Sequence, residues 1–395
     1  MIPMIASIPN PSCSNGRSNE ALKNRDMLCF SHDWTGDPLS KTHLMRLLSK
    51  DNRVLWINSI GYRNPTASKA DVSRAFHKLA AATAPIQNPE PNIFVLSPLV
   101  IPAYGSKLIR ALNQRLLRLQ VLRAMKKLGF RQPINWVFNP AASVVAGTLG
   151  EDRVIYYCVD EYTAFSGVST QSLSEMEQQL VRRADLVIVS AKKLYESKAH
   201  LNPNTHLIRH GVDYEHFRKS LDPRTEVPAD IACLPRPIIG YFGLIASDWV
   251  DVPLLVHVAE SFPEASLVML GKKTMDVTEL TRLPNVHLLG RKPYQSLPAY
   301  AKAFDVALIP FPINTATLNS NPLKAREYLA AGLPVVSTRI PEVEVLGQCC
   351  IGDDPPSFVR QIREALQNPG PNAARSDTMR SESWAARLDE IRNLM

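Results

Sequence analysis

The chain has 395 residues, of which 45% are hydrophobic and 21% charged, and its formal net charge is +8. This length and apolar content exclude both a single small core and a disordered chain. The six cysteines form no CxxC pair and accompany no histidine cluster, so they indicate neither a disulfide framework nor a structural metal. The positive charge suits a protein that meets anionic ligands or an anionic membrane surface.

The first half of the chain predicts a series of buried strands separated by helices. Residues 1–25, rich in proline, serine and asparagine, predict a flexible leader. After this leader we expect a helix over residues 39–50. Apolar runs predict strands over 26–30, 53–58, 93–96, 134–138, 154–159 and 186–189. Because these runs lack strict alternation, they are typical of parallel strands covered on both faces.

The second half repeats this pattern. Its apolar runs predict strands over 238–242, 266–270, 286–289, 306–309 and 335–337. The chain is therefore predicted to be an α/β protein with two Rossmann-like domains that face each other across a cleft. We expect an N-terminal domain over 26–210, a C-terminal domain over 211–370 and a C-terminal helix over 371–395 that crosses back to the first domain. Prolines between residues 210 and 237 interrupt the periodicity and place the hinge there.

No apolar run approaches the length of a membrane-spanning helix, and no signal peptide precedes the first strand, so we expect a cytoplasmic protein. Residues 107–128 carry seven basic residues and no acid, with leucines at helical spacing (Leu108, Leu112, Leu116, Leu119 and Leu122). This stretch predicts an amphipathic helix. It could rest on anionic lipid at the inner face of the cell membrane or pack on the N-terminal sheet, and the two roles are compatible.

The segment TLNSNPLKAREYLAAGLPVVST, residues 317–338, predicts a helix that opens toward a ligand. Asn321 is a good N-cap, Pro322 suits the first helical position, and Gly332 with Pro334 ends the helix before a valine-rich strand. A helix that begins in a crevice at the carboxyl end of a strand offers free backbone N–H groups to a phosphate.

Two side chains of this helix have the chemistry to support such a ligand. Lys324 lies in the first turn and can add a full positive charge to the anion site. Glu327 follows at i+3, where its carboxylate could accept hydrogen bonds from a pair of ribose hydroxyls. The alternative is an ordinary capped helix with an exposed Lys/Glu pair.

This motif resembles the donor motif of the GT-B fold glycosyltransferases, in particular the large family four and its relatives in exopolysaccharide and teichuronic-acid synthesis. The resemblance extends to IGYFGLIASDWVD, LVMLGKK, NVHLLGRKPYQSLPAYAKAFDVALIPF and IRHGVDYEHF, in the family's order. It implies a transferase that uses a nucleotide-sugar. It implies a donor site that comprises Gly243, Arg291, Tyr294, Asn321, Pro322, Leu323, Lys324 and Glu327.

Within that site the resemblance assigns individual roles. Glu327 would bind the donor ribose, and the backbone at residues 322–323, assisted by Lys324, would hold the diphosphate. Gly243 would let its loop approach the diphosphate, and residues 291–294 would lie near the nucleobase. Two departures point to the xanthan-type glucuronosyltransferases and the teichuronic-acid branch: Asn319 stands where many members carry a glutamate, and no Arg or Lys follows Gly243.

In the N-terminal half, the strand over 154–159 ends in Asp160 and Glu161. A carboxylate there would face the cleft, where partial burial raises its pKa and helps it take a proton from an acceptor hydroxyl. Related enzymes place a His or an Asp at this point, so we predict Asp160 as the base; the alternative is that Asp160 or Glu161 caps the turn. His32 and Gly36, after the first strand, are predicted with Glu161 as acceptor or cleft residues, unless His32 is a packed loop histidine.

The sequence thus predicts a hexosyl- or uronosyltransferase. It would move a sugar from a nucleotide-sugar donor to a hydroxyl of a saccharide or lipid-linked acceptor in surface polysaccharide (exopolysaccharide) synthesis. We expect no cofactor and no required metal, because Lys324 and helix N–H groups can neutralise the leaving diphosphate. No nucleic-acid partner is expected. Two alternatives stay open: a sugar-nucleotide epimerase on the same fold, and a catalytically silent nucleotide-sugar-binding subunit.

Overall fold

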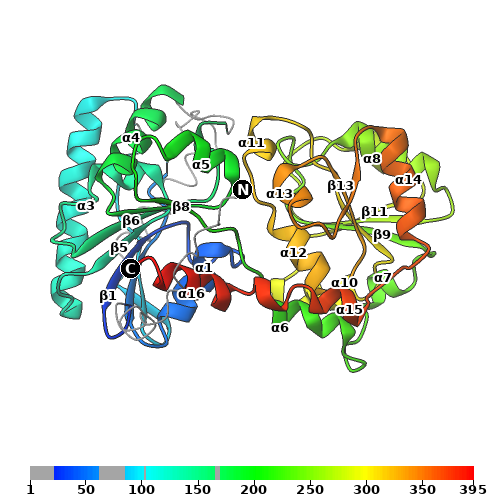
Figure 1. The fold of residues 1–395 in the computed structure, drawn as a ribbon, viewed down its shortest axis with the longest axis horizontal. Helices are drawn as coiled ribbons and strands as arrows, with labels where there is room; N and C mark the ends of the chain where they lie inside the picture. The colour runs from blue at the N-terminus through cyan, green and yellow to red at the C-terminus, as the bar shows by residue number, and fades with distance from the viewer. Residues whose placement is uncertain (1–21, 62–84, 102–103, 165–169) are drawn as a thin grey trace, which may run out of the picture.

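The computed structural model describes residues 22–61, 85–101, 104–164 and 170–395, which form two α/β lobes side by side (Figure 1). The N-terminal lobe contains an eight-stranded sheet. Its strands, in spatial order, are β3 (Gln87–Glu90), β4 (Ile93–Leu96), β2 (Arg53–Ile57), β1 (Asp26–Phe30), β5 (Ile134–Val137), β6 (Arg153–Cys158), β7 (Leu186–Val189) and β8 (Thr205–Leu207). The helices of this lobe are α1 (Ser40–Leu48), α3 (Lys107–Leu128), α4 (Thr170–Arg183), α5 (Lys192–Lys198) and the 3₁₀ helices η1 (Pro140–Val144) and η2 (Tyr162–Ala164).

The C-terminal lobe contains a six-stranded parallel sheet. Its order is β11 (Val286–Gly290), β10 (Ser266–Leu270), β9 (Ile238–Phe242), β12 (Val306–Ile309), β13 (Val335–Thr338) and β14 (Cys350–Gly352). Its longer helices are α8 (Val252–Ser261), α12 (Leu323–Ala330) and α14 (Pro355–Ala365), while α16 (Trp384–Arg392), the last helix of the chain, packs on the N-terminal lobe. The shorter ones are α6 (Tyr214–Phe217), η3 (Arg218–Leu221), α7 (Ala229–Ala232), α9 (Thr278–Thr281), η4 (Tyr294–Ser296), α10 (Leu297–Ala301), α11 (Thr315–Leu318), α13 (Pro341–Glu344), α15 (Ala373–Asp377) and η5 (Arg380–Glu382).

The prediction of two Rossmann-like domains is confirmed. Every residue of β5, β7, β9, β10, β12 and β13 is buried, which explains why these strands read as continuous apolar runs. Three short strands were not predicted, namely β3, β8 and β14, because their sequences are short and carry no apolar run. Of these, β3 pairs antiparallel with β4 at the edge of the N-terminal sheet, so that sheet is not wholly parallel.

Two segments connect the lobes, and they pair with each other. Val212, on the way into the C-terminal lobe, forms a parallel bridge with Ser383 on the way back. Gly211 is pressed against this return segment: a Cβ at Gly211 would lie 2.7 Å from the backbone nitrogen of Trp384. A side chain at position 211 would therefore push the two crossing segments apart.

The last residues do not form the single helix expected over 371–395. Helix α15 packs on the C-terminal lobe, where Ser376 Oγ donates to the Ala330 carbonyl at 2.6 Å. After η5, helix α16 crosses to the N-terminal lobe, where Trp384, Leu388 and Ile391 join the core (Figure 1). The flexible leader predicted over residues 1–25 does not extend to Leu22, because Leu22 is fully buried in that same core. Residues 1–21 lie outside the part of the chain that the structure describes.

Candidate active site

Three adjoining cavities lie between the lobes. The first, of about 520 Å³, is lined by Gly36, Asp37, Pro38, Leu39, Phe242, Gly243, Leu244, Leu270, Gly271, Lys272, Arg291, Lys292, Tyr294, Leu297, Leu323, Lys324 and Glu327. The second, of about 180 Å³, is lined by Leu39, Ser40, Lys41, Val159, Asp160, His210, Leu244, Trp249, Phe311, Ser320, Asn321, Pro322, Leu323 and Lys324. The third, of about 750 Å³, is lined by Ser31, His32, Leu39, Lys41, Ser59, Phe138, Asn139, Asp160, Tyr162, Leu244, Ala246, Ser247, Asp248, Trp249, Lys272 and Thr274.

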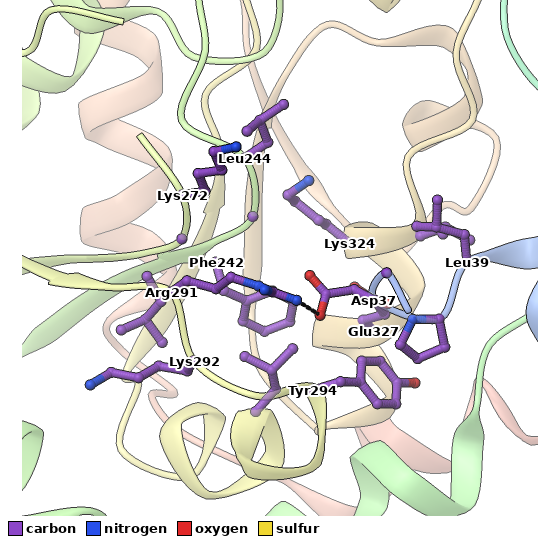
Figure 2. A pocket seen from close by; sticks show the side chains of 17 residues that line it. Asp37, Leu39, Phe242, Leu244, Lys272, Arg291, Lys292, Tyr294, Lys324 and Glu327 are labelled. Carbon is purple, nitrogen blue, oxygen red and sulfur yellow. Dashed lines mark hydrogen bonds and ion pairs between the residues drawn. The ribbon is translucent and has the colours of Figure 1, made fainter. Parts of the chain in front are cut away.

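Helix α12 presents its first turn to the first cavity. Its position relative to β9 is set by Tyr328, whose buried hydroxyl accepts a hydrogen bond from the backbone N–H of Phe242 at 2.8 Å. Leu323, Lys324 and Glu327 line the cavity, and Figure 2 shows Lys324 and Glu327 among its lining side chains. The first N–H groups of a helix have no partner within it, so this end of α12 combines free donors with a lysine.

The Lys324 side chain occupies space that Gly243 leaves open, and Gly271 in turn lies against the Gly243 backbone. Its amino group lies over the rings of Tyr241 and Phe311, 5.6 and 5.5 Å from their centroids. A Cβ at Gly243 would lie 2.6 Å from Lys324 Nζ, and a Cβ at Gly271 would lie 1.7 Å from the carbonyl oxygen of Gly243. Both glycines have positive φ, +143° and +152°, so glycine suits the turns after β9 and β10 on conformational as well as steric grounds.

Burial changes the acid–base properties of both charged residues on α12. It raises the pKa of Glu327 to about 7; nearby Asp213 also raises this pKa, while Lys324 lowers it. Burial also lowers the pKa of Lys324, and the Glu327 carboxylate opposes this shift. A carboxyl that titrates near neutrality in a cavity is typical of a binding or catalytic site rather than of an exposed helix pair.

Arg291 and Tyr294 line the first cavity after β11. Arg291 Nη2 forms an ion pair of 2.7 Å with Oδ1 of Asp37, which belongs to the other lobe (Figure 2). Both side chains are more than half exposed, so this pair connects the lobes but adds little stability. The Tyr294 ring stacks on His216 with centroids 4.3 Å apart.

The structure corrects the predicted start of α12. Pro322 is the N-cap with extended backbone, the helix begins at Leu323, and Asn321 does not cap it. Asn321 Oδ1 instead accepts from Arg326 Nη1 at 2.7 Å, and its Nδ2 donates to the Ser190 carbonyl of the other lobe at 2.7 Å. Asn321 and Pro322 line the second cavity rather than the first, so the Asn321 side chain connects α12 to the other lobe instead of capping the helix.

Asp160 lies where the sequence predicted it, after β6, and it lines both the second and the third cavity. Burial raises its pKa to about 6; Lys41 lowers this pKa and Glu161 raises it. Lys41, in the first turn of α1, lines the same two cavities, and burial lowers its pKa. The sequence analysis missed Lys41. A lysine in the first turn of a helix is disfavoured by the helix dipole and could have drawn attention to it.

Glu161 does not face the cavities, contrary to the prediction. Its Oε2 lies 3.6 Å from Lys198 Nζ, which also lies 3.5 Å from Glu177 Oε2. Its other oxygen accepts from the hydroxyl of Thr163. Lys198 and Glu177 are buried, so the Glu161 carboxylate belongs to an internal charge network that holds the loop after Asp160.

His32 and Gly36 follow β1 but line different cavities. His32 lines the third cavity beside Asp160, and burial, assisted by Lys41, lowers its pKa to about 3, so its imidazole is neutral. Gly36 lines the first cavity with Asp37 instead of the acceptor side. His210, which the sequence analysis also missed as a site residue, lines the second cavity.

Two doubly wound lobes that enclose such a cleft define the GT-B class, and solved structures show the same fold. The sucrose-phosphate synthase of Thermosynechococcus elongatus superposes with a TM-score of 0.68 at 14% identity, over 94% of this chain and 98% of that one. A trehalose-phosphate synthase of Burkholderia xenovorans in complex with glucose-6-phosphate gives 0.67 at 12%, over 94% and 100%. Anabaena HepE in complex with UDP-glucose gives 0.58 at 14%, over 92% and 94%.

Sequence comparisons add the activity class. Residues 236–368 match the family described as glycosyl transferases group 1. The Bacillus subtilis protein TuaH, named as a teichuronic acid biosynthesis glycosyltransferase, is 26% identical over 283 residues, which are 65% of this chain and 70% of TuaH. The chain is a glycosyltransferase of the GT-B fold, as the resemblance in the sequence implied.

Proposed function

We propose that this enzyme transfers a hexosyl or uronosyl group from a nucleotide-sugar to a hydroxyl of a saccharide or lipid-linked acceptor in surface polysaccharide synthesis. The observation that carries the proposal is the placement of Lys324 and Glu327 on one side of α12, in a cavity that both lobes line. A lysine beside free helix N–H groups suits a diphosphate, and a carboxylate one turn away suits ribose hydroxyls.

The donor lies in the first cavity in this proposal. The diphosphate contacts Lys324 and the backbone N–H groups at the start of α12, and Glu327 accepts hydrogen bonds from the ribose. Gly243 allows the loop after β9 to come close to the diphosphate, and the nucleobase lies toward Arg291 and Tyr294. HepE, whose structure contains UDP-glucose, has the same fold, and this supports the proposal of a nucleotide-sugar donor.

The acceptor lies in the third cavity, with Asp160 as the base. The acceptor oxygen forms a bond to the anomeric carbon, and its proton passes to the Asp160 carboxylate. The bond between the anomeric carbon and the diphosphate oxygen breaks, and its electron pair leaves with the nucleoside diphosphate. Cations and N–H groups that face this oxygen stabilise the charge that develops there, so the proposed reaction requires no metal.

The proposal is tested with purified protein and a panel of UDP- and GDP-sugars. A rise in melting temperature with one nucleotide, lost in Glu327→Ala, supports the donor site. Asp160→Asn should keep this binding and lose transfer to an acceptor, and unchanged transfer would remove Asp160 from the mechanism. Turnover of the nucleotide-sugar without any acceptor would favour the epimerase. Binding without turnover, despite a panel of saccharide and lipid-linked acceptors, would favour the silent binding subunit.

We also propose that helix α3 rests on an anionic membrane, near a lipid-linked acceptor on the inner face. The side of α3 that packs on the lobe consists of Asn113, Leu117, Val121, Ala124 and Met125, rather than the predicted leucine stripe. The leucines of that stripe that are exposed are Leu108, Leu112 and Leu119. Exposed leucines on an outer helix that has several cations and no acid suit insertion at an anionic interface.

Two further exposed residues extend this apolar surface. Leu99 and Ile101 precede α3 and are held against it by hydrogen bonds from their backbone N–H groups to Gln120 Oε1 and Asn113 Oδ1, at 2.8 and 2.9 Å. The helix lies at the edge of the N-terminal lobe farthest from the other lobe (Figure 1). Among the described residues no helix is long and apolar enough to cross a membrane.

Sedimentation with vesicles tests the membrane contact. Wild-type protein should bind vesicles that contain phosphatidylglycerol and not those of phosphatidylcholine alone, and Leu108→Ser with Leu112→Ser should abolish this binding. The matched control is Ile313→Ser with Val345→Ser, which removes two exposed apolar side chains elsewhere on the surface. The membrane contact would be ruled out if wild-type protein bound both kinds of vesicle equally. It would also be ruled out if the two double variants bound anionic vesicles equally.

A further inference from the structure

Lys272 has a position that no other charged side chain among the described residues shares. It follows β10 and lines both the first and the third cavity. The other residues common to these two cavities are Leu39 and Leu244, both apolar. In a transferase with its donor in one cavity and its acceptor in the other, the bond that breaks must lie at their junction.

The other cations of the first cavity are mostly engaged. Arg291 forms its ion pair with Asp37, and Lys292 forms one of 2.7 Å with Asp230. The side chain of Lys272 is exposed and has neither a hydrogen-bond nor an ion-pair partner in the part of the chain that the structure describes. Lys272 and Lys324 are therefore the cations that remain available to an anion in this cavity.

The surrounding loops create a need for a second cation. The loop after β9, residues 244–251, contains no basic residue, and its Asp248 lines the third cavity. Asp160 adds a further carboxylate on the acceptor side of the junction. A diphosphate that carries several negative charges among these acids would be poorly neutralised by one lysine with a lowered pKa.

We infer that Lys272 is a catalytic residue that contacts the leaving diphosphate at the junction of the two cavities, together with Lys324. This inference rests on the proposed function, because it requires a nucleotide-sugar in the first cavity. Figure 2 shows both amino groups directed to the same side of the cavity, beside Leu244. As the bond between the anomeric carbon and the diphosphate oxygen breaks, charge increases on that oxygen, and a cation fixed there lowers the barrier.

The turn after β10 holds the backbone of Lys272 in place. Gly271, immediately before Lys272, lies against the Gly243 carbonyl, and its backbone N–H donates to the Gly290 carbonyl at 2.8 Å. The carbonyl of Lys272 accepts from the Ile245 N–H at 2.9 Å. The backbone of Lys272 is thus held on both sides, so that only its side chain must become ordered when a ligand binds.

Binding to a matched series of ligands tests the inference. Calorimetry with UDP and GDP, each with its monophosphate and nucleoside, is performed on wild type, Lys272→Ala, Lys272→Arg and Lys273→Ala. Lys273 is the matched control, because it is the neighbouring exposed lysine and lines none of the three cavities. Lys272→Ala should weaken nucleoside diphosphate binding about tenfold or more, and it should leave nucleoside binding unchanged. Lys272→Arg should restore most of the loss.

Kinetics supply the second readout. Lys272→Ala should lower kcat by about a hundredfold, more than it raises KM, because the contact strengthens in the transition state. If wild type binds a nucleoside diphosphate and Lys272→Ala matches Lys273→Ala in both binding and kcat, the inference is wrong while the proposed function survives. If wild type binds no nucleotide of either series, the proposed function fails and the inference fails with it.

Discussion

The end of the Lys324 side chain lies where a side chain at residue 243 would be, since a Cβ at Gly243 would come 2.1 Å from Lys324 Cε. The contact is with the flexible end of a lysine, so an added methyl group would displace the amino group rather than break the lobe. This relationship joins two motifs about eighty residues apart, and it makes the glycine turn after β9 and the first turn of α12 a single unit.

Gly243→Ala should therefore weaken diphosphate binding more than it weakens the fold. The methyl group moves the Lys324 amino group, and alanine at a φ of +143° is strained, which costs about 1–3 kcal/mol. We expect roughly a tenfold loss of nucleoside diphosphate affinity by calorimetry, with nucleoside affinity retained. Gly105→Ala, at a turn with no atom within 4 Å, is the control. Undiminished diphosphate binding in folded Gly243→Ala would contradict this interpretation of the contact.

The raised pKa of Glu327 predicts that nucleoside binding depends on pH. Because this pKa is about 7 in the free protein, the carboxyl is mostly protonated at pH 6 and mostly ionised at pH 8. Hydrogen bonds from ribose hydroxyls favour the ionised form, so affinity should rise by about tenfold across this range. A nucleoside is the suitable ligand because it has no phosphate that titrates. In Glu327→Gln the dependence should disappear, and a persistent slope would assign it to another group.

The acidic limb of the rate profile should respond to Lys41. Asp160, with a pKa of about 6, must be ionised to accept a proton, so kcat/KM should fall as the pH drops below about 6. Lys41 lowers the pKa of Asp160, and Lys41→Met should move this limb to higher pH by about one unit. Lys50→Met, at the exposed residue just after α1, should leave the profile unchanged. An unmoved limb in Lys41→Met would mean that Asp160 is not the titrating group.

The internal network around Lys198 predicts a strong effect on stability. Lys198→Met leaves the carboxylates of Glu161 and Glu177 without their buried cation, which should cost about 3–5 kcal/mol of unfolding free energy near neutral pH. Burial already raises the pKa of Glu177, and loss of Lys198 raises it further. A folded pKa above the unfolded one means that ionisation destabilises the folded state. The loss should therefore increase as the pH rises and be smaller at pH 5 than at pH 8.

Urea denaturation at the two pH values measures this difference. Lys193→Met, at an exposed position of the same helix, should change the unfolding free energy by less than about 0.5 kcal/mol. A Lys198→Met variant as stable as Lys193→Met, or one equally destabilised at both pH values, would show that the network is not the source of the stability.

The fold could be predicted from local patterns because parallel strands that are buried on both faces have continuous apolar sequences. Residues 26–30, 93–96, 186–189, 238–242, 266–270 and 306–309 are strands with the predicted bounds. Edge strands such as β3 and β14 gave no such signal, because one side of an edge strand has no neighbour and its sequence need not be apolar. The long helix over 107–128 was also predicted, but not which of its sides is buried, since that depends on what packs against it.

The sequence by itself determined the two-lobed fold and the motif of Lys324 and Glu327, because strand burial, helix signals and i+3 spacing are local properties. The tertiary structure decided which polar groups face the cleft. Glu161 and Asp160 are neighbours in sequence, yet one pairs with Lys198 in the interior and the other lines the cavities. Lys41 and Lys272 gained their positions from α1 and β10, elements far apart in the chain, and only the meeting of the two lobes places both lysines beside the same cavity.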